Sequence, residues 1–197
     1  MKFKIIISLI FFLLCGFSAN SQIAQTRYTY NAEELDKAIR LYDTKLISLS
    51  ERKIDEVIES IPENPANDKA LMFETQLDLI NGNFVLAETH LLDFLDERKN
   101  SPFVPIANFR LGMIHFQQDK FETAAYYLDK AYETAKSNYN TRHEKTDSKP
   151  EEEYYTVGHH SLYWKGIAES QIGKLNDAKE TLQMCAEVYR NGELSDD

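Results

Sequence analysis

Residues 111–131 read LGMIHFQQDKFETAAYYLDKA and combine small residues with large apolar residues at regular spacing. The large apolar residues recur at intervals of three and four, which is the period of one face of an α-helix. Gly112 and Ala124 stand at positions where a bulky side chain would keep two packed helices apart. The segment therefore predicts a pair of antiparallel helices in close contact.

The same pattern occurs in two further segments, which begin at Ala70 and Ser161. In each copy an apolar residue lies three positions before an alanine, and a leucine follows four positions after that alanine. These markers are Phe84, Ala87 and Leu91; Phe121, Ala124 and Leu128; and Leu175, Ala178 and Leu182. Gly82 and Gly173 share a position that suits the left-handed residue at the end of a helix. One hairpin cannot bury its apolar face alone, so we expect the copies to stack.

These markers resemble the tetratricopeptide repeat, a helix–turn–helix unit. The resemblance covers about residues 68–190 and is carried by Leu111, Gly112, Phe121, Ala124, Leu128 and Ala131. It implies an all-α fold, a right-handed α-solenoid of about four stacked antiparallel helix hairpins. Two positions depart from the pattern: Thr75 replaces the glycine of the first helix in one copy, and Lys165 replaces the usual leucine in another.

The predicted organisation has seven segments. They are a signal peptide (1–21), a degenerate N-terminal helical hairpin (22–67), a repeat (68–101), a second repeat (102–137), a polar insertion loop (138–150), a repeat with a lengthened first helix (151–192), and a tail or the start of a further repeat (193–197). The loop is predicted because the spacing from Ala124 to Ala178 is longer than that from Ala87 to Ala124, and the excess is polar and charged. It is either a solvated excursion without a task or a loop that contacts a partner.

Residues 1–21 have a basic start, an apolar run and a small-residue exit, which together are typical of a secretory signal. The apolar run is shorter than the roughly 20 residues that a membrane-spanning helix needs. We therefore expect export to the periplasm or cell envelope, without membrane insertion once the signal is removed. A lipid anchor at Cys15 is disfavoured, because Leu14 stands where lipoprotein processing prefers a small residue.

The chain is acidic, with a formal net charge of −10. An acidic surface repels nucleic acid and anionic lipid, so neither is an expected partner. Removal of the signal would leave Cys185 as the single cysteine, which excludes an intramolecular disulfide. Stability must then come from an apolar core.

The sequence contains no motif that predicts catalysis. The five histidines lack the spacing of a zinc site, and the adjacent His159 and His160 would point about 100° apart on a helix. His115 occupies a position where the resemblance implies tyrosine, and Cys185 one that needs a small side chain, so both are expected to pack. We expect no enzyme activity, no catalytic or metal-binding residue and no cofactor.

The resemblance also implies which residues line a concave surface formed by the first helices of the hairpins. They are Met72, Gln76, Ile80, Phe109, Met113, Phe116, Gln117, His160, Tyr163 and Ile167. Apolar and aromatic side chains with little charge suit an extended or helical segment of a protein or peptide. A neighbouring element covering this face is the alternative.

The resemblance implies a non-catalytic scaffold for protein–protein interactions in the bacterial cell envelope. The alternative is a periplasmic sensing or interaction module of a larger signalling or envelope-spanning protein. No polar capping helix follows the last predicted hairpin, so self-association or further repeats are expected through it.

Overall fold

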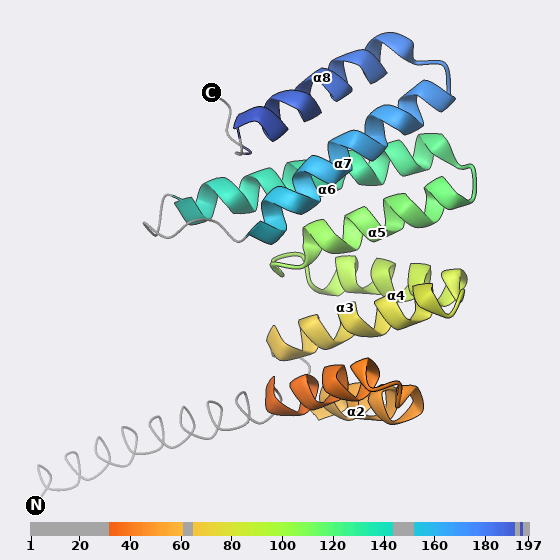
Figure 1. Ribbon diagram of the computed structural model, residues 1–197, viewed down its shortest axis with the longest axis vertical. Coiled ribbons are helices and arrows are strands. Elements are labelled where there is room, and N and C mark those ends of the chain that lie inside the picture. The colour runs from red at the N-terminus through yellow and green to blue at the C-terminus, as the bar shows by residue number, and fades with distance from the viewer. Residues whose placement is uncertain (1–31, 61–64, 144–151, 192–193, 195–197) are drawn as a thin grey trace, which may run out of the picture. The chain divides into compact units, whose positions relative to one another are not determined.

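The computed structural model describes residues 32–60, 65–143, 152–191 and 194. Within these ranges every regular element is a helix, which confirms the all-α class. A helix at residues 32–43 is followed by α2 (Ile47–Ser60), α3 (Pro65–Ile80), α4 (Phe84–Glu97), α5 (Val104–Gln117), α6 (Phe121–His143), α7 (Glu152–Gln171) and α8 (Leu175–Asn191), labelled in Figure 1. The chain divides into two compact units after Glu74, inside α3.

In the first unit, the helix at residues 32–43 packs against α2. The Ser50 hydroxyl of α2 donates a 2.7 Å hydrogen bond to the Ala38 carbonyl oxygen, and both residues are fully buried. The apolar side chains buried in these two helices are Leu35, Ala38, Ile54 and Val57. A small residue at position 38 lets the two backbones approach closely enough for this bond.

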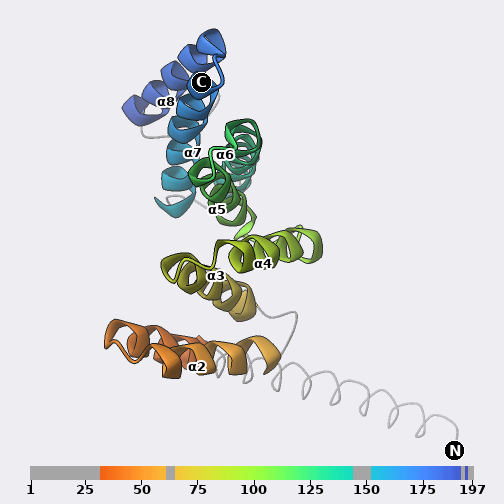
Figure 2. The ribbon, with the colours of Figure 1, turned by 90° about the vertical axis from the view of Figure 1, so that its right-hand side faces the viewer.

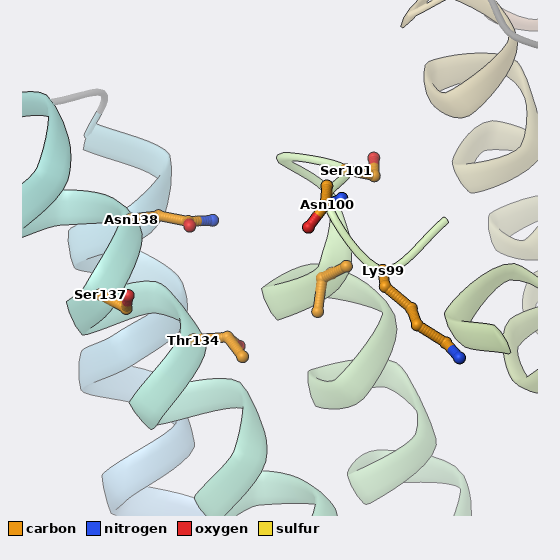
Figure 3. A pocket seen from close by; sticks show the side chains of 7 residues that line it. Lys99, Asn100, Ser101, Thr134, Ser137 and Asn138 are labelled. Atoms are coloured by element: carbon orange, nitrogen blue, oxygen red, sulfur yellow. The ribbon is translucent and has the colours of Figure 1, made fainter. Parts of the chain in front are cut away.

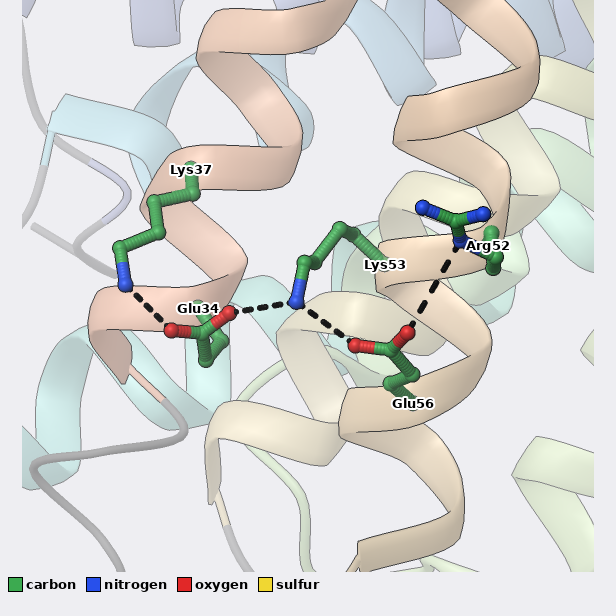
Figure 4. A network of polar contacts seen from close by, with 5 residues as sticks. All are labelled: Glu34, Lys37, Arg52, Lys53 and Glu56. Carbon is green, nitrogen blue, oxygen red and sulfur yellow. Dashed lines mark hydrogen bonds and ion pairs between the residues drawn. The ribbon is translucent and has the colours of Figure 1, made fainter.

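A chain of ion pairs also joins these two helices (Figure 4). The Lys53 ammonium on α2 lies 2.9 Å from a carboxylate oxygen of Glu34 and 2.7 Å from one of Glu56. Lys37 pairs with the other oxygen of Glu34. Hydrogen bonds from Lys37 and Lys53 lower the pKa of Glu34, and those to Glu56 and Glu34 raise the pKa of Lys53. Both groups therefore stay charged at neutral pH.

Four helix pairs share one kind of turn. Each turn contains a residue with positive φ: 67° at Lys45, 78° at Gly82, 58° at Asp119 and 78° at Gly173. The backbone N–H that follows each of them donates to a carbonyl five residues earlier: Leu46 to Leu41, Asn83 to Asp78, Lys120 to His115, and Lys174 to Glu169. This is the six-to-one bond of the Schellman motif, which ends a helix and satisfies a free carbonyl. The predicted left-handed glycines are confirmed.

In the second unit, helices α4 to α8 pack in chain order, and α5 also contacts α7 (Figures 1 and 2). A Cβ built on Gly112 of α5 would lie 2.6 Å from the Leu128 Cγ of α6, and one on Gly166 of α7 would lie 2.6 Å from the Leu182 Cγ of α8. The alanines of the repeat pattern are 0 %, 0 % and 4 % exposed at positions 87, 124 and 178. The predicted close contact between paired helices is confirmed.

Polar side chains bind the second unit together at the two positions that depart from the repeat pattern. The Lys165 ammonium on α7 lies 2.6 Å from the Asp129 carboxylate on α6. Thr75 is buried and its hydroxyl accepts a 2.6 Å hydrogen bond from the Arg110 guanidinium on α5. At both departures the substituted residue makes a polar contact with another helix.

The predicted polar loop at residues 138–150 is wrong for its first part, because α6 continues to His143. Tyr139 is 4 % exposed and packs in a core cluster with Leu162 and Val188, so an apolar anchor extends the helix. Residues 144–150 lie outside the described residues, as do the predicted signal peptide and Cys15.

The same cluster holds Leu194, which is fully buried. A Cβ on Gly158 of α7 would lie 2.7 Å from a methyl carbon of Leu194, so this glycine makes room for the leucine. Leu194 belongs to the predicted tail or further repeat (193–197), whose other residues lie outside the described ranges.

Candidate interaction surface

Two neighbouring helices, α5 and α7, carry most of the side chains predicted to contact a partner. These are Phe109, Met113, Phe116 and Gln117 on α5, with His160, Tyr163 and Ile167 on α7. Gln117 and His160 are exposed, Tyr163 is 45 % exposed, and the others are half-buried. We call this set, together with Trp164, the α5–α7 surface.

Aromatic rings connect the two helices. The Phe116 ring centre lies 5.0 Å from that of Trp164 and 5.2 Å from that of Phe121, both edge to face. The rings of Tyr163 and Trp164 are 5.4 Å apart, also edge to face. Such pairs add attraction beyond the area they bury. Mutual packing therefore fixes the ring positions, while Tyr163 remains 45 % exposed.

Trp164 is the residue of this surface that sequence reasoning missed. It packs against the buried core of Ala124, Leu128 and Ala168. The resemblance to the tetratricopeptide repeat assigns Tyr163, but not the adjacent Trp164, to the concave surface. The available signal was composition, because this is the single tryptophan of the chain.

Arg110 on α5 and Lys165 on α7 are engaged with residues of other helices. The Lys165 ammonium is held by Asp129 at 2.6 Å and lies 3.8 Å from Glu169. The Arg110 guanidinium on α5 donates to Thr75 and, at 3.4 Å, to Gln76 on α3. The α5–α7 surface itself is formed by apolar, aromatic and amide side chains and one histidine.

The three predicted contact residues on α3 differ in exposure. Gln76 is exposed, and Ile80 is 57 % exposed; both belong to the second unit. Met72 belongs to the first unit and is 4 % exposed, so its prediction as a contact residue is wrong. A methionine is flexible enough to fill an interior gap, and the repeat position alone does not distinguish that use.

His115 has the packing role that was predicted. Its ring stacks on Tyr127 with centres 5.4 Å apart and is 6 % exposed. Burial lowers the pKa of His115, although the Glu88 carboxylate, 3.7 Å from Nε2, partly opposes this. The imidazole is therefore neutral at pH 7.

Cys185 on α8 lies beside the backbone of His159 on α7. The Cys185 thiol is 7 % exposed and lies 3.6 Å from the His159 carbonyl oxygen. Burial raises the pKa of this thiol, which keeps it protonated and unreactive. Burial and the adjacent His160 lower the pKa of His159. Among the described residues, no three His, Cys, Asp or Glu side chains gather in a way that would hold a metal ion.

None of the helices in the described ranges is both long and apolar enough to cross a membrane. No protein-family model matches this chain, and no curated protein sequence matches it. Function is therefore inferred from the surfaces of the chain itself.

Proposed function

We propose that this protein is a non-catalytic scaffold that binds a protein or peptide segment across the α5–α7 surface. The observation that carries the proposal is a set of solvent-accessible rings on two adjoining helices: half-buried Phe109 and Phe116 on α5, and exposed Tyr163 with half-buried Trp164 on α7. Aromatic side chains and methionine are enriched where proteins bind one another, and charged side chains are depleted at the centre of such sites.

The mechanism is presentation of a rigid apolar surface. Because the rings pack on each other and on buried alanines, little side-chain freedom is lost when a partner binds. The partner would place its own apolar side chains between the rings and leave its polar groups toward solvent. Gln117 and His160, which are both exposed, would supply hydrogen bonds that fix the direction of the partner segment.

We further propose that the helix pairs form a right-handed, tetratricopeptide-like solenoid. Two features support it: the same Schellman bond closes four helix pairs, and the first helices α5 and α7 contact each other as well as their own partners. The signal-like residues 1–21 support export to the periplasm or envelope.

The test is capture of partners from an envelope extract with the purified protein as bait. The double variant Phe109→Ala/Tyr163→Ala is expected to lose the captured protein, because it removes two rings from the surface. Tyr126→Ala on α6 is the matched control, since Tyr126 is 57 % exposed and lies outside the α5–α7 surface. Circular dichroism checks that each variant remains helical. Equal capture by the folded double variant and the control would contradict the proposal.

A further inference from the structure

A pocket of about 280 Å³ lies between the α4–α5 loop and the C-terminal half of α6 (Figure 3). Asn100, Ser101 and Val104 line it from the loop and the start of α5, and Thr134, Ser137 and Asn138 line it from α6. Because α5 and α6 run antiparallel and α6 has 23 residues against 14 in α5, these α6 residues lie level with the beginning of α5.

The lining is polar but carries no carboxylate, although the chain has 32 acidic residues. Its single charged member is Lys99, whose ammonium lies 3.5 Å from the Asp96 carboxylate. In Figure 3 the Lys99 side chain extends away from α6. The groups that face each other across the pocket are therefore neutral hydroxyls and carboxamides.

The hydrogen bonds that the pocket side chains make within the protein determine which donors and acceptors they still have for a ligand. The Thr134 hydroxyl donates to the Lys130 carbonyl at 2.7 Å, so its lone pairs remain to accept. The Ser101 hydroxyl accepts from the Phe103 N–H at 3.3 Å, so its own proton remains to be donated. The carboxamides of Asn100 and Asn138 each both donate and accept. The pocket thus presents donors and acceptors together.

This mixture of donors and acceptors favours a ligand whose polar groups both donate and accept hydrogen bonds. A small oxyanion only accepts hydrogen bonds, and it would lie against the lone pairs of Thr134. An alcohol hydroxyl donates and accepts at the same atom, and neighbouring hydroxyls on a sugar ring reach several such partners at once. Val104 adds an apolar contact for the C–H face of the ring.

We propose that this pocket binds a neutral carbohydrate of one or two sugar rings. Its volume of about 280 Å³ is just below the roughly 300–1,000 Å³ typical of small-molecule sites, which suits a ligand of this size. The pocket shares no residue with the α5–α7 surface, so the proposal stands independently of the partner-binding function.

The test is an NMR titration of the isotope-labelled protein with glucose, mannose, N-acetylglucosamine, maltose and cellobiose. At least one sugar is expected to shift the backbone amides of residues 100, 101, 134, 137 and 138 and to saturate at millimolar concentration. Asn138→Ala is expected to weaken that binding about tenfold, the effect of losing about one good hydrogen bond. Asn140→Ala, two residues further along α6 and outside the lining, is expected to leave it unchanged.

Three results would overturn the proposal. The first is that none of the sugars shifts these amides. The second is that Asn138→Ala and Asn140→Ala have the same effect on binding. The third is tighter saturation of the same amides by phosphate, acetate or a short neutral capped peptide, which would assign the pocket to an anion or to a polypeptide.

Discussion

Replacing Gly112 with alanine tests whether the close packing of paired helices requires a residue without a side chain. In an exposed helix this change stabilises by about 1 kcal/mol, because alanine has the higher helix propensity. Here the new methyl group would lie 2.6 Å from Leu128 Cγ, 2.9 Å from Cδ2 and 3.3 Å from the Leu128 backbone nitrogen. Leu128 is fully buried and the nitrogen belongs to α6, so neither can move freely. Overpacking of this kind costs about 1–3 kcal/mol, which gives a net loss of up to about 2 kcal/mol.

A double-mutant cycle separates the two effects. In a Leu128→Ala background the two closest clashing atoms, Cγ and Cδ2, are gone and only the backbone nitrogen remains, at 3.3 Å, so Gly112→Ala is expected to stabilise by up to the propensity gain of about 1 kcal/mol. The coupling energy between the two sites should then be about 1–3 kcal/mol. The same cycle at Gly166 and Leu182 should give a smaller value, because Leu182 is only half-buried and can shift.

The assay is urea unfolding followed by circular dichroism at fixed pH and temperature. A coupling energy near zero, or a stabilising effect of Gly112→Ala in the otherwise unchanged protein, would refute close contact between α5 and α6. Leu128→Ala alone removes a buried side chain and costs about 2–5 kcal/mol, so the Gly166 cycle provides the result if that variant does not fold.

Three further outcomes are expected. Gly173→Ala should destabilise by about 1 kcal/mol in thermal unfolding, because its φ of 78° strains any side chain while nothing lies within 4 Å of the new methyl group. Thr181→Val should cost about 1–3 kcal/mol in urea unfolding, because it removes the 2.8 Å hydrogen bond to the buried Glu169 carboxylate. Since the pKa of His115 is lowered from 6.5 in the folded protein, the unfolded chain binds this proton more readily. The contribution of His115 to the free energy of unfolding is therefore fully present above about pH 6.5 and is lost as the pH falls. His115→Phe should reduce the decrease of the urea unfolding midpoint between pH 7.5 and pH 5.

Local constraints made part of the fold predictable. Gly82 and Gly173 stand where the backbone is left-handed, and Gly112 and Gly166 where a Cβ would meet a leucine. The turns at Lys45 and Asp119 use the same backbone conformation without glycine, at a cost of about 1–2 kcal/mol. Packing of the helices offsets that cost. The left-handed conformation at Lys45 and Asp119 therefore could not be predicted from the sequence pattern.

The errors all concern positions decided by distant parts of the chain. Met72 is interior rather than exposed, and Tyr139 carries α6 past the point where its sequence becomes polar. Trp164 joins the predicted surface because α5 lies beside α7, and Leu194 is buried because Gly158 leaves room for it. Spacing within one segment predicts which face of a helix is apolar, but not which element covers that face.

Photo-crosslinking most directly tests the proposal that partners bind across α5 and α7. A photoreactive phenylalanine analogue would replace Tyr163 in one variant and Tyr126 in another; these side chains are 45 % and 57 % exposed. After irradiation in an envelope extract, a discrete crosslinked partner is expected from position 163 and none from position 126. Adducts from position 126 alone, or the same adducts from both positions, would contradict binding at the α5–α7 surface.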